Sequence, residues 1–177
     1  MPSGKTHDAI TFLLAPPVFA AAYAATGTAS LSIVVTAAFL FGGLMFGPDL
    51  DTVSKQYSRW MIFRTFWLPY RTVFNHRSRW SHGLIFGTLF RVVYFMGALS
   101  LAALAGFVIK SFFLGGTAIG VEPLASAWQQ FGELIRSNLG NSFLPAAFIG
   151  MWTGAASHTF TDMAGTYIKT GRVTEFL

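Results

Sequence analysis

The sequence predicts an all-α protein, a polytopic membrane helical bundle of about four spans with additional interfacial amphipathic helices. Three observations lead to this fold class. The 177 residues are 53% hydrophobic and only 11% charged, whereas soluble proteins average about 25% charged residues. The apolar residues gather in four segments, and basic and aromatic residues typical of a lipid headgroup region lie between them. The length fits a single domain, residues 1–177.

The composition also excludes several classes of protein. The apolar content is too high for a disordered chain, and the chain has no cysteine, which excludes disulfide scaffolds, thiolate catalysis and iron–sulfur clusters. The net charge of +5 fits either a nucleic-acid partner or the cytoplasmic face of a membrane protein. The positions of the charges must therefore decide between the two.

The four apolar segments differ in how well they fit a bilayer. They are Ala9–Ala25, Ala29–Phe46, Leu84–Phe113 and Phe143–Ala156. The second and third contain uncharged stretches of eighteen residues, which is the length that a hydrocarbon core requires. The first contains Pro16 and Pro17, which are expected to kink or break a helix, and the fourth is only fourteen residues long. These two segments are either short spans or helices packed inside the bundle.

Two further segments predict interfacial helices. Gly47–Ser81 interleaves basic and aromatic residues, a pattern that is also found on platforms for single-stranded nucleic acid. Next to membrane spans the pattern indicates a belt at the lipid headgroups instead. We therefore expect membrane lipid, and not nucleic acid, as the partner of this segment. Val121–Ser137 carries its apolar residues at helical spacing and predicts a second amphipathic helix.

The basic residues predict the orientation. If all four segments span, one side holds nine of the twelve basic residues: Lys5, Lys55, Arg59, Arg64, Arg71, Arg77, Arg79, Lys169 and Arg172. The other side holds Arg136 with Lys110 close to it, while Arg91 lies inside the third segment. By the positive-inside rule the crowded side is cytoplasmic. His7 and Asp8 directly precede the first apolar segment, which argues against a cleaved signal peptide.

Every histidine and aspartate of the chain falls in one of four short motifs. These are Thr6-His7-Asp8, Gly47-Pro48-Asp49-Leu50-Asp51, His76-Arg77-Ser78-Arg79-Trp80-Ser81-His82 and Ser157-His158-Thr159-Phe160-Thr161-Asp162. In the four-span topology each motif begins or ends an apolar segment on the cytoplasmic side. All eight residues are therefore expected to converge at one end of the bundle.

A cluster of this kind predicts a metal site, because imidazole and carboxylate oxygen are suitable ligands for Zn²⁺, Mn²⁺ and Fe²⁺. His158 and Asp162 share a helix face, and Asp49 and Asp51 point the same way if their turn is extended. We expect one or two divalent ions, zinc first with manganese or iron as alternatives. The predicted ligands are Asp49, Asp51, His76, His82, His158 and Asp162.

The predicted site also suggests roles for residues beside the ligands. His7 or Asp8 either joins the ligands or acts as the general base toward an attacking water. Arg77 and Arg79 are placed to hold an anionic substrate such as a phosphate group. Two metals a few ångströms apart would suit phosphoryl chemistry.

Some of these residues also have a structural interpretation. Asp8 suits the first turn of a helix capped by Thr6, where a carboxylate complements the helix dipole. Asp51 suits the cap of a short helix beginning near Thr52, and a single histidine such as His7 is uninformative alone. The pair His158 and Asp162 is harder to explain in this way, because polar residues near bilayer depth are costly and tend to be paired or functional.

At these residues the chain resembles a bacterial family of metal-binding membrane proteins. The resemblance rests on Ser3-Gly4-Lys5-Thr6-His7-Asp8, Gly47-Pro48-Asp49-Leu50-Asp51, Ser54-x-x-Tyr57-x-Arg59-Trp60, Trp67-x-Pro69-Tyr70-Arg71 and His76-Arg77-Ser78-x-x-Ser81-His82-Gly83. That family is similar to membrane-bound metal-dependent hydrolases, and both look distantly related to the zinc-dependent phospholipase C and P1 nuclease superfamily, whose His-x-x-x-Asp pair is like His158 and Asp162. The resemblance implies a helical bundle and phosphoester hydrolysis. The soluble superfamily has more histidines than the four found here and uses an N-terminal amino group as a ligand, so a three-zinc site is not expected.

The sequence therefore predicts a multi-pass protein of a bacterial cytoplasmic or internal membrane, with a metal site on the cytoplasmic side. Its predicted activity is hydrolysis of a phosphoester of a lipid or another membrane-associated, phosphorylated substrate. The alternative is a non-catalytic assembly or scaffold protein with a structural metal or a polar cluster. A metal transporter ranks last, since the ligands lie at segment ends rather than near mid-span.

Overall fold

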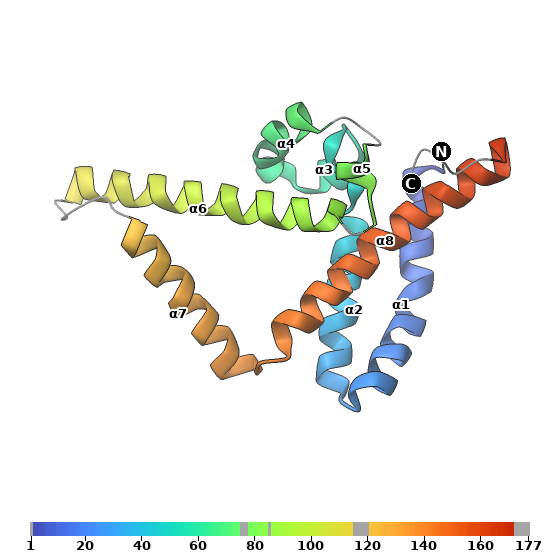
Figure 1. Ribbon diagram of the computed structural model, residues 1–177, viewed down its shortest axis with the longest axis horizontal. Coiled ribbons are helices and arrows are strands. Elements are labelled where there is room, and N and C mark those ends of the chain that lie inside the picture. Colours follow the sequence, from blue (N-terminus) through green and yellow to red (C-terminus); the bar gives the residue numbers. More distant parts are fainter. Residues whose placement is uncertain (1, 75–77, 85, 115–120, 172–177) are drawn as a thin grey trace.

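The computed structural model describes residues 2–74, 78–84, 86–114 and 121–171, and it is all-helical in these ranges. In chain order the elements are α1 (Gly4–Thr26), α2 (Ala29–Leu44), the 3-10 helix η1 (Pro48–Asp51), α3 (Lys55–Arg59), the 3-10 helix η2 (Met61–Trp67), α4 (Leu68–Val73), α5 (Arg79–His82), α6 (Phe86–Leu114), α7 (Val121–Leu139) and α8 (Phe143–Thr170). Helices α1 and α2 form a hairpin, and α8 crosses it (Figure 1). The all-α prediction is confirmed.

Helix α1 begins and ends with ordinary capping geometry. Ser3, rather than Thr6, caps its start, since the Ser3 hydroxyl accepts a hydrogen bond from the Thr6 N–H at 3.2 Å. Its end is closed by Gly27, which takes a left-handed conformation (φ 67°) and donates its N–H to the Tyr23 carbonyl. The helix continues through Pro16 and Pro17 without a break. Each proline removes one backbone donor, and the neighbouring turns keep the helix continuous.

Helices α2 and α8 cross with their backbones in direct contact. A Cβ atom at Gly154 would lie 2.0 Å from the Phe39 carbonyl oxygen, and one at Gly150 would lie 2.2 Å from that of Val35. Small residues at such positions let two helices approach closely, as in membrane helix pairs. The crossing brings the middle of α8 against the end of α2.

The fourth apolar segment does not end where the sequence suggested. Helix α8 runs on past Ala156 to Thr170, because the polar residues after Ala156 are buried against α1, α2 and η1 instead of terminating a span. Three helices of the described part of the chain are long and apolar enough to cross a membrane, Gly4–Thr26, Ala29–Asp51 and Phe86–Phe113. The sequence predicted about four such segments. The described part of the chain has three, and α8 is not among them.

The segment between α2 and α6 is less of a surface belt than the sequence suggested. Trp67 and Tyr70 are fully buried, and with Phe46, Leu50 and Tyr57 they form an aromatic core. Other residues of this segment fit the prediction of an exposed apolar surface, since Ile62 and Phe63 are 77% and 56% exposed. The buried part of the predicted belt thus packs against Leu50, which lies between Asp49 and Asp51, and is held together by ring contacts such as Trp67 with Tyr70.

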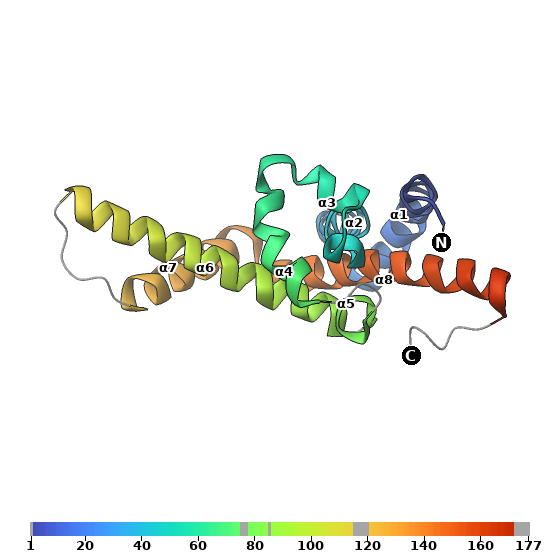
Figure 2. The same cartoon turned by 90° about the horizontal axis from the view of Figure 1, so that it is seen from above.

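Helix α6 does not run parallel to the α1–α2 hairpin, as a simple four-helix bundle would require. It starts beside the crossing of α2 and α8 and extends away from it toward α7, at a steep angle to the hairpin (Figures 1 and 2). Its beginning is held by the Trp152 indole N–H, which donates to the Leu84 carbonyl at 2.6 Å, and by the Tyr94 hydroxyl, which donates to the Phe66 carbonyl. These contacts fix its direction, and its far half is exposed.

Candidate metal centre

Six of the predicted site residues lie together at the crossing of the helices. They come from four separate segments: His7 from α1, Asp49 and Asp51 from η1, His82 from α5, and His158 and Asp162 from α8. The pair Asp49 and Asp51 reaches the site from a 3-10 turn, not from the extended turn that the sequence suggested. The sequence predicted convergence at segment ends, whereas His158 and Asp162 lie within α8 (Phe143–Thr170) and join the others where that helix crosses the hairpin.

The ligand atoms form two groups that share Asp162. In the first group His7, His158 and Asp162 each offer one atom within 4.8 Å of the others, and in the second Asp49, His82 and Asp162 do so. The His7 Nε2 lies 3.3 Å from Asp162 Oδ1, and the His158 Nε2 lies 3.6 Å from Asp162 Oδ2. The two oxygens of Asp162 thus face two different histidines.

The spacing of these atoms suits a shared ion better than direct hydrogen bonds. The His158 Nε2 to Asp49 Oδ2 distance is 3.3 Å and the His82 Nε2 to Asp49 Oδ1 distance is 3.7 Å, beyond the usual range for N–H···O bonds. Two ligands of a tetrahedral zinc ion, each about 2.0–2.1 Å from the metal, are separated by about 3.3 Å. The described donor set therefore fits a divalent cation.

Burial supports the same conclusion. His7, His82, His158 and Asp162 are at most 5% exposed, yet both Asp162 carboxylate oxygens and the His158 Nε2 have no hydrogen-bond partner among the described residues. Buried carboxylates without partners are costly. Asp49, with 19% of its side chain exposed, is the member of the cluster that reaches the surface.

Gln56 of α3 connects the cluster to the backbone around it. Its amide oxygen accepts from the Asp49 N–H at 3.1 Å, and its amide nitrogen donates to the Gly43 carbonyl at 2.7 Å. These two bonds fix the orientation of the amide, so that its nitrogen also faces the His158 Nδ1 at 3.1 Å. In this arrangement Nδ1 accepts and Nε2 of the neutral ring carries the hydrogen, directed toward Asp49. The His158 ring also stacks on that of His7, with centroids 3.7 Å apart.

Arg91 of α6 is a charged residue beside the cluster. It is 2% exposed and donates from Nη1 to the Ser81 carbonyl at 2.6 Å and from Nη2 to the Thr88 hydroxyl at 3.0 Å. It also interacts electrostatically with Tyr70, Asp51 and Asp49. Burial raises the pKa of the Tyr70 hydroxyl, although the nearby Arg91 acts in the opposite direction. Tyr70 is therefore neutral beside the guanidinium.

Asp8 is not part of the cluster. Its carboxylate pairs with Lys55 Nζ at 2.9 Å and with Arg59 Nη2 at 2.7 Å, and these contacts tie α1 to α3. His7, one residue earlier, turns toward Asp162 instead. The structure thus separates the two residues that the sequence analysis considered together as the base.

Three predicted residues cannot be placed. His76 and Arg77 lie outside the described residues, and so does the side chain of Arg79, whose backbone begins α5. Their predicted roles as ligand and anion-binding groups stay predictions. The site instead contains two residues that the sequence analysis did not select, Gln56 and Arg91. Arg91 carried a usable signal, because a charge inside an apolar segment tends to be functional, whereas Gln56 carried none.

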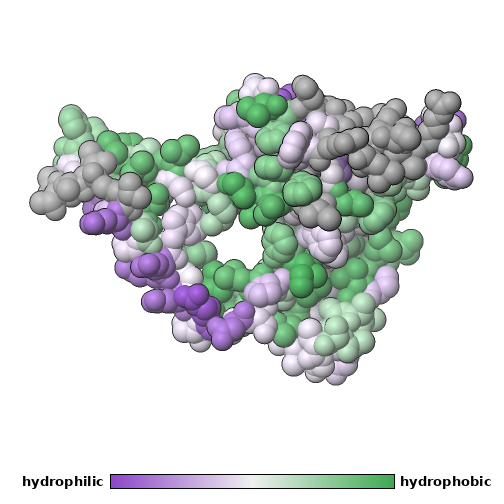
Figure 3. Space-filling model, viewed as in Figure 1, coloured by the Kyte–Doolittle hydropathy of each residue, from purple (hydrophilic) through white to green (hydrophobic). Residues whose placement is uncertain are grey.

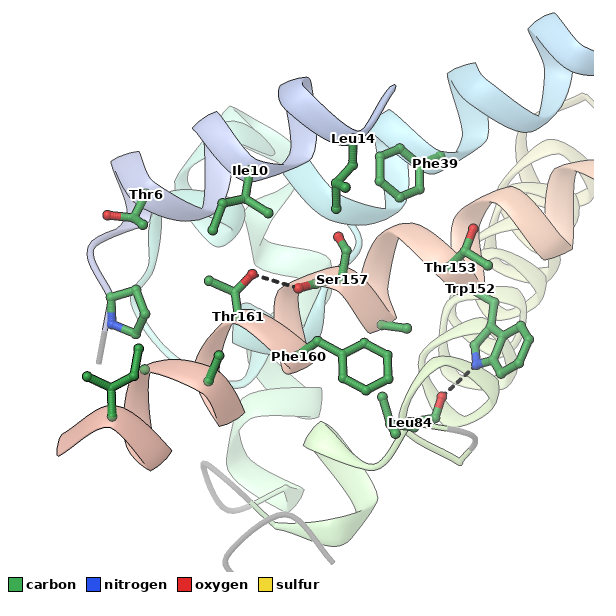
Figure 4. Close-up of a pocket in the computed structure, with 15 residues that line it drawn as sticks. Thr6, Ile10, Leu14, Phe39, Leu84, Trp152, Thr153, Ser157, Phe160 and Thr161 are labelled. Carbon is green, nitrogen blue, oxygen red and sulfur yellow. Dashed lines mark hydrogen bonds between the residues drawn. The ribbon is translucent and has the colours of Figure 1, made fainter. Parts of the chain in front are cut away.

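A largely apolar cavity of about 890 Å³ runs along the seam between α1 and α8. In Figure 4, Thr6, Ile10 and Leu14 of α1 lie across it from Ser157, Phe160 and Thr161 of α8. Thr6, Ser157 and Thr161 directly precede His7, His158 and Asp162 in the sequence. The cavity therefore follows the same two helix segments that hold the cluster.

Comparison with known proteins identifies a family. The model of a family described as uncharacterized metal-binding protein matches residues 2–172. No curated protein and no solved structure matches the chain, so the expected similarity to hydrolases and to the P1 nuclease superfamily gains no support from these comparisons. The match includes all six residues of the cluster and covers nearly the whole sequence, and the chain therefore belongs to this family of metal-binding proteins.

Proposed function

We propose that this protein is a membrane-embedded metal-dependent hydrolase that cleaves a phosphoester of a lipid or membrane-associated substrate. The observation that carries the proposal is the buried cluster of His7, Asp49, His82, His158 and Asp162, which is contributed by four segments and has at its centre the Asp162 carboxylate, whose oxygens have no hydrogen-bond partner among the described residues. A buried group of histidines and carboxylates around a common point is expected where a cation is bound.

Each of the two groups of ligands would hold one ion. His7, His158 and Asp162 would hold one ion, and Asp49 and His82, with Asp162 between the groups, would hold a second. When bound in such a site, a divalent ion supplies Lewis-acid polarisation of a phosphoryl oxygen. Asp49 reaches the surface and so lies where a water and a substrate headgroup would approach. Asp51, whose Oδ2 is 3.6 Å from the His82 Nδ1, places a further negative charge beside that imidazole.

The distribution of apolar side chains supports the membrane part of the proposal. Among the described residues, fourteen polar or charged residues are buried, compared with eight hydrophobic ones. Much of the face shown in Figure 3 is hydrophobic. Exposed residues include Leu13, Ile33 and Phe112 at 75%, 59% and 82%. Such a surface is stable in lipid, where polar groups are the ones that must be enclosed.

The apolar cavity between α1 and α8 supports a lipid substrate. It has the size of a small-molecule site, and its hydrophobic lining suits an acyl chain. A phosphorylated lipid would place its chain along this seam and its phosphate near the cluster.

The experiment that tests the metal site is elemental mass spectrometry on the detergent-purified protein. We expect at least one zinc, manganese or iron ion per chain in the wild type and none in Asp162→Asn, because Asp162 belongs to both groups. Asp8→Asn is the matched control, since this carboxylate lies outside the cluster, and it should retain the wild-type metal content. Wild-type protein that holds no metal after incubation with these ions would contradict the proposal.

The experiment that tests the activity measures phosphate released from phosphatidic acid in mixed micelles, with the metal content determined on the same sample. Release that requires the metal supports a hydrolase. A protein that binds metal stoichiometrically but releases no phosphate favours the second candidate, a structural metal that ties α1, η1, α5 and α8 together. The deep burial of most of the cluster is the observation that favours this alternative, because structural sites are closed.

The membrane location is tested with single cysteines, since the chain has none of its own. Ser54 lies near the cluster, whereas Thr28 lies at the turn between α1 and α2, at the opposite end of the hairpin (Figure 1). In sealed vesicles, Ser54→Cys and Thr28→Cys should react with an impermeant reagent from opposite sides. Reaction of both from the same side would contradict a membrane-spanning hairpin.

A further inference from the structure

Arg91 is an unusual residue for its position. It lies near the start of the longest apolar helix, α6, and it is 2% exposed. A guanidinium buried in this way is costly unless its environment provides acceptors and negative charge. Both are present here, since two arms of the group donate to Ser81 and Thr88, and Asp49 and Asp51 interact with it electrostatically.

The contact with Ser81 leads directly to the metal centre. Ser81 precedes His82, and its hydroxyl lies 3.0 Å from the His82 Nδ1. The α6 backbone approaches the same carbonyl, since a Cβ atom at Gly87 would lie 2.6 Å from the Ser81 oxygen. The turn that presents His82 is therefore pressed against α6 at Gly87 and fastened there by Arg91.

We propose that Arg91 is a positioning residue of the metal centre, which holds the Ser81–His82 turn so that the His82 imidazole faces Asp49. This inference rests on the proposed metal site. In this interpretation a residue of α6 controls the geometry of the ligand group formed by Asp49, His82 and Asp162. The His82 Nε2 faces Asp49 Oδ1 at 3.7 Å because the backbone of this residue is fixed from the other side.

An effect of charge alone predicts the opposite result. If Arg91 acted only through its positive charge, removing that charge would leave the carboxylates more negative and would raise the affinity for a cation. If Arg91 acts by placing His82, its removal lowers the affinity, and the loss depends on the presence of His82. The direction of the change in cation affinity and its dependence on His82 therefore distinguish the two roles of Arg91.

The test is a double-mutant cycle on metal affinity, measured by titrating Co²⁺ into the full-length protein in detergent and recording its visible absorption. Arg91→Met should weaken Co²⁺ binding about tenfold, the lower end of what outer-shell partners of a metal ligand contribute, and should change the spectrum in the same way as His82→Ala. In the His82→Ala background, where His7, His158 and Asp162 still offer a site, Arg91→Met should have no further effect. Arg91→Lys, which can still donate to the Ser81 carbonyl, should restore part of the affinity.

Two controls keep the result interpretable. Thr88→Val removes an acceptor of Arg91 while leaving the guanidinium in place, and it should give a smaller loss that again disappears in the His82→Ala background. It serves as the test if Arg91→Met does not fold. Arg136→Gln on the exposed surface of α7 should leave Co²⁺ binding unchanged.

Additive losses, or tighter binding by Arg91→Met, would overturn the inference while the wild-type protein still binds metal. Failure of the wild-type protein to bind Co²⁺ would instead remove the proposed function itself.

Discussion

The crossing of α1, α2 and α8 and the arm formed by α6 and α7 follow opposite packing rules. At the crossing, the backbones touch at glycines, and many of the enclosed side chains are polar, among them histidines, aspartates, threonines and Gln56. Along the arm, large apolar side chains such as Leu101 and Phe112 are exposed, and the most apolar stretch of α6 is not buried at all. A polar contact between α6 and α7 is the hydrogen bond that the Trp128 indole N–H donates to the Ser100 hydroxyl.

This difference bears on which surroundings would suit each region. In water, the arm would expose its apolar surface at a cost of about 25 cal/mol per Å², while the crossing would lose little by opening. In a bilayer the costs are reversed, because lipid solvates the arm and the polar cluster must be enclosed. Variants in the two regions should therefore respond differently.

The largest effect is expected at the helix crossing. Gly154→Ala places a methyl group 2.0 Å from the Phe39 carbonyl oxygen and must push α8 away from α2, at a cost of about 3 kcal/mol or more. Gly106→Ala on α6, where a Cβ atom meets nothing within 4 Å, is the matched control and should be neutral or slightly stabilising. Thermal unfolding followed by circular dichroism in detergent measures both, and equal melting temperatures would contradict the difference between the regions.

A charge on the arm should interfere with membrane insertion. Leu101→Lys places an ammonium on an α6 surface that is 69% exposed, at a cost of about 3 kcal/mol if that surface meets lipid. The measurement is the fraction of protein in carbonate-washed membranes after expression. Gln130→Lys on the polar surface of α7 should insert normally. If Leu101→Lys also inserts normally, the arm lies in water rather than in lipid.

Removal of the metal should destabilise the crossing and not the arm. Metal at a hundredfold excess over its dissociation constant stabilises the folded state by about 2.7 kcal/mol, so a chelator should lower the melting temperature by about 5–10 °C. Asp162→Asn should not respond to the chelator. In its presence this variant should melt above the wild type, because a buried carboxylate that lacks hydrogen-bond partners in the described part of the chain has been neutralised. A wild-type melting temperature that does not change on chelation argues against a metal in the core.

The smallest effect is expected at Gln56. With the amide nitrogen facing His158 Nδ1, the amide opposes the tautomer in which Nε2 is available to a metal. Gln56→Glu offers a carboxylate to the Nδ1–H, as in carboxylate–histidine pairs, but its oxygen replaces the donor to the Gly43 carbonyl, so it should tighten metal binding by less than about tenfold. Gln56→Leu leaves the Asp49 N–H and the Gly43 carbonyl without this partner and should weaken it. Calorimetric Zn²⁺ titration separates the two, and weaker binding by Gln56→Glu would contradict the tautomer assigned to His158.

The sequence predicted the helices well where composition alone decides. Segments such as Ala29–Phe46 are too long and too apolar to form anything but a helix in a chain of this composition. It was less successful at helix ends and at breaks. Polar residues at Ser157 and His158 suggested the end of a helix, and Pro16 and Pro17 suggested a break, but contacts with α1, α2 and η1 support a continuous α8, and α1 runs through its prolines.

The candidate site divides along the same line. That His7, Asp49, Asp51, His82, His158 and Asp162 would meet followed from the sequence, because their motifs begin or end apolar segments and segment ends on one side of a bundle are neighbours. Which of these residues face one another could not be predicted from the sequence, because a rotation of α1 by one residue exchanges His7 for Asp8. The salt bridges of Asp8 with Lys55 and Arg59 select His7.

By itself the sequence determined the all-helical fold class, the apolar segments and the set of residues able to bind a metal, since these depend on composition and on spacing along one chain. The tertiary structure decided that α6 leaves the hairpin at a steep angle, that Asp162 is shared between two groups of ligands, and that Gln56 and Arg91 belong to the site. Those features depend on how closely backbones approach at Gly150 and Gly154 and on which side chain fills the space that remains. Contacts between residues far apart in the chain leave no periodic signal in the sequence, and only the packed structure fixes them.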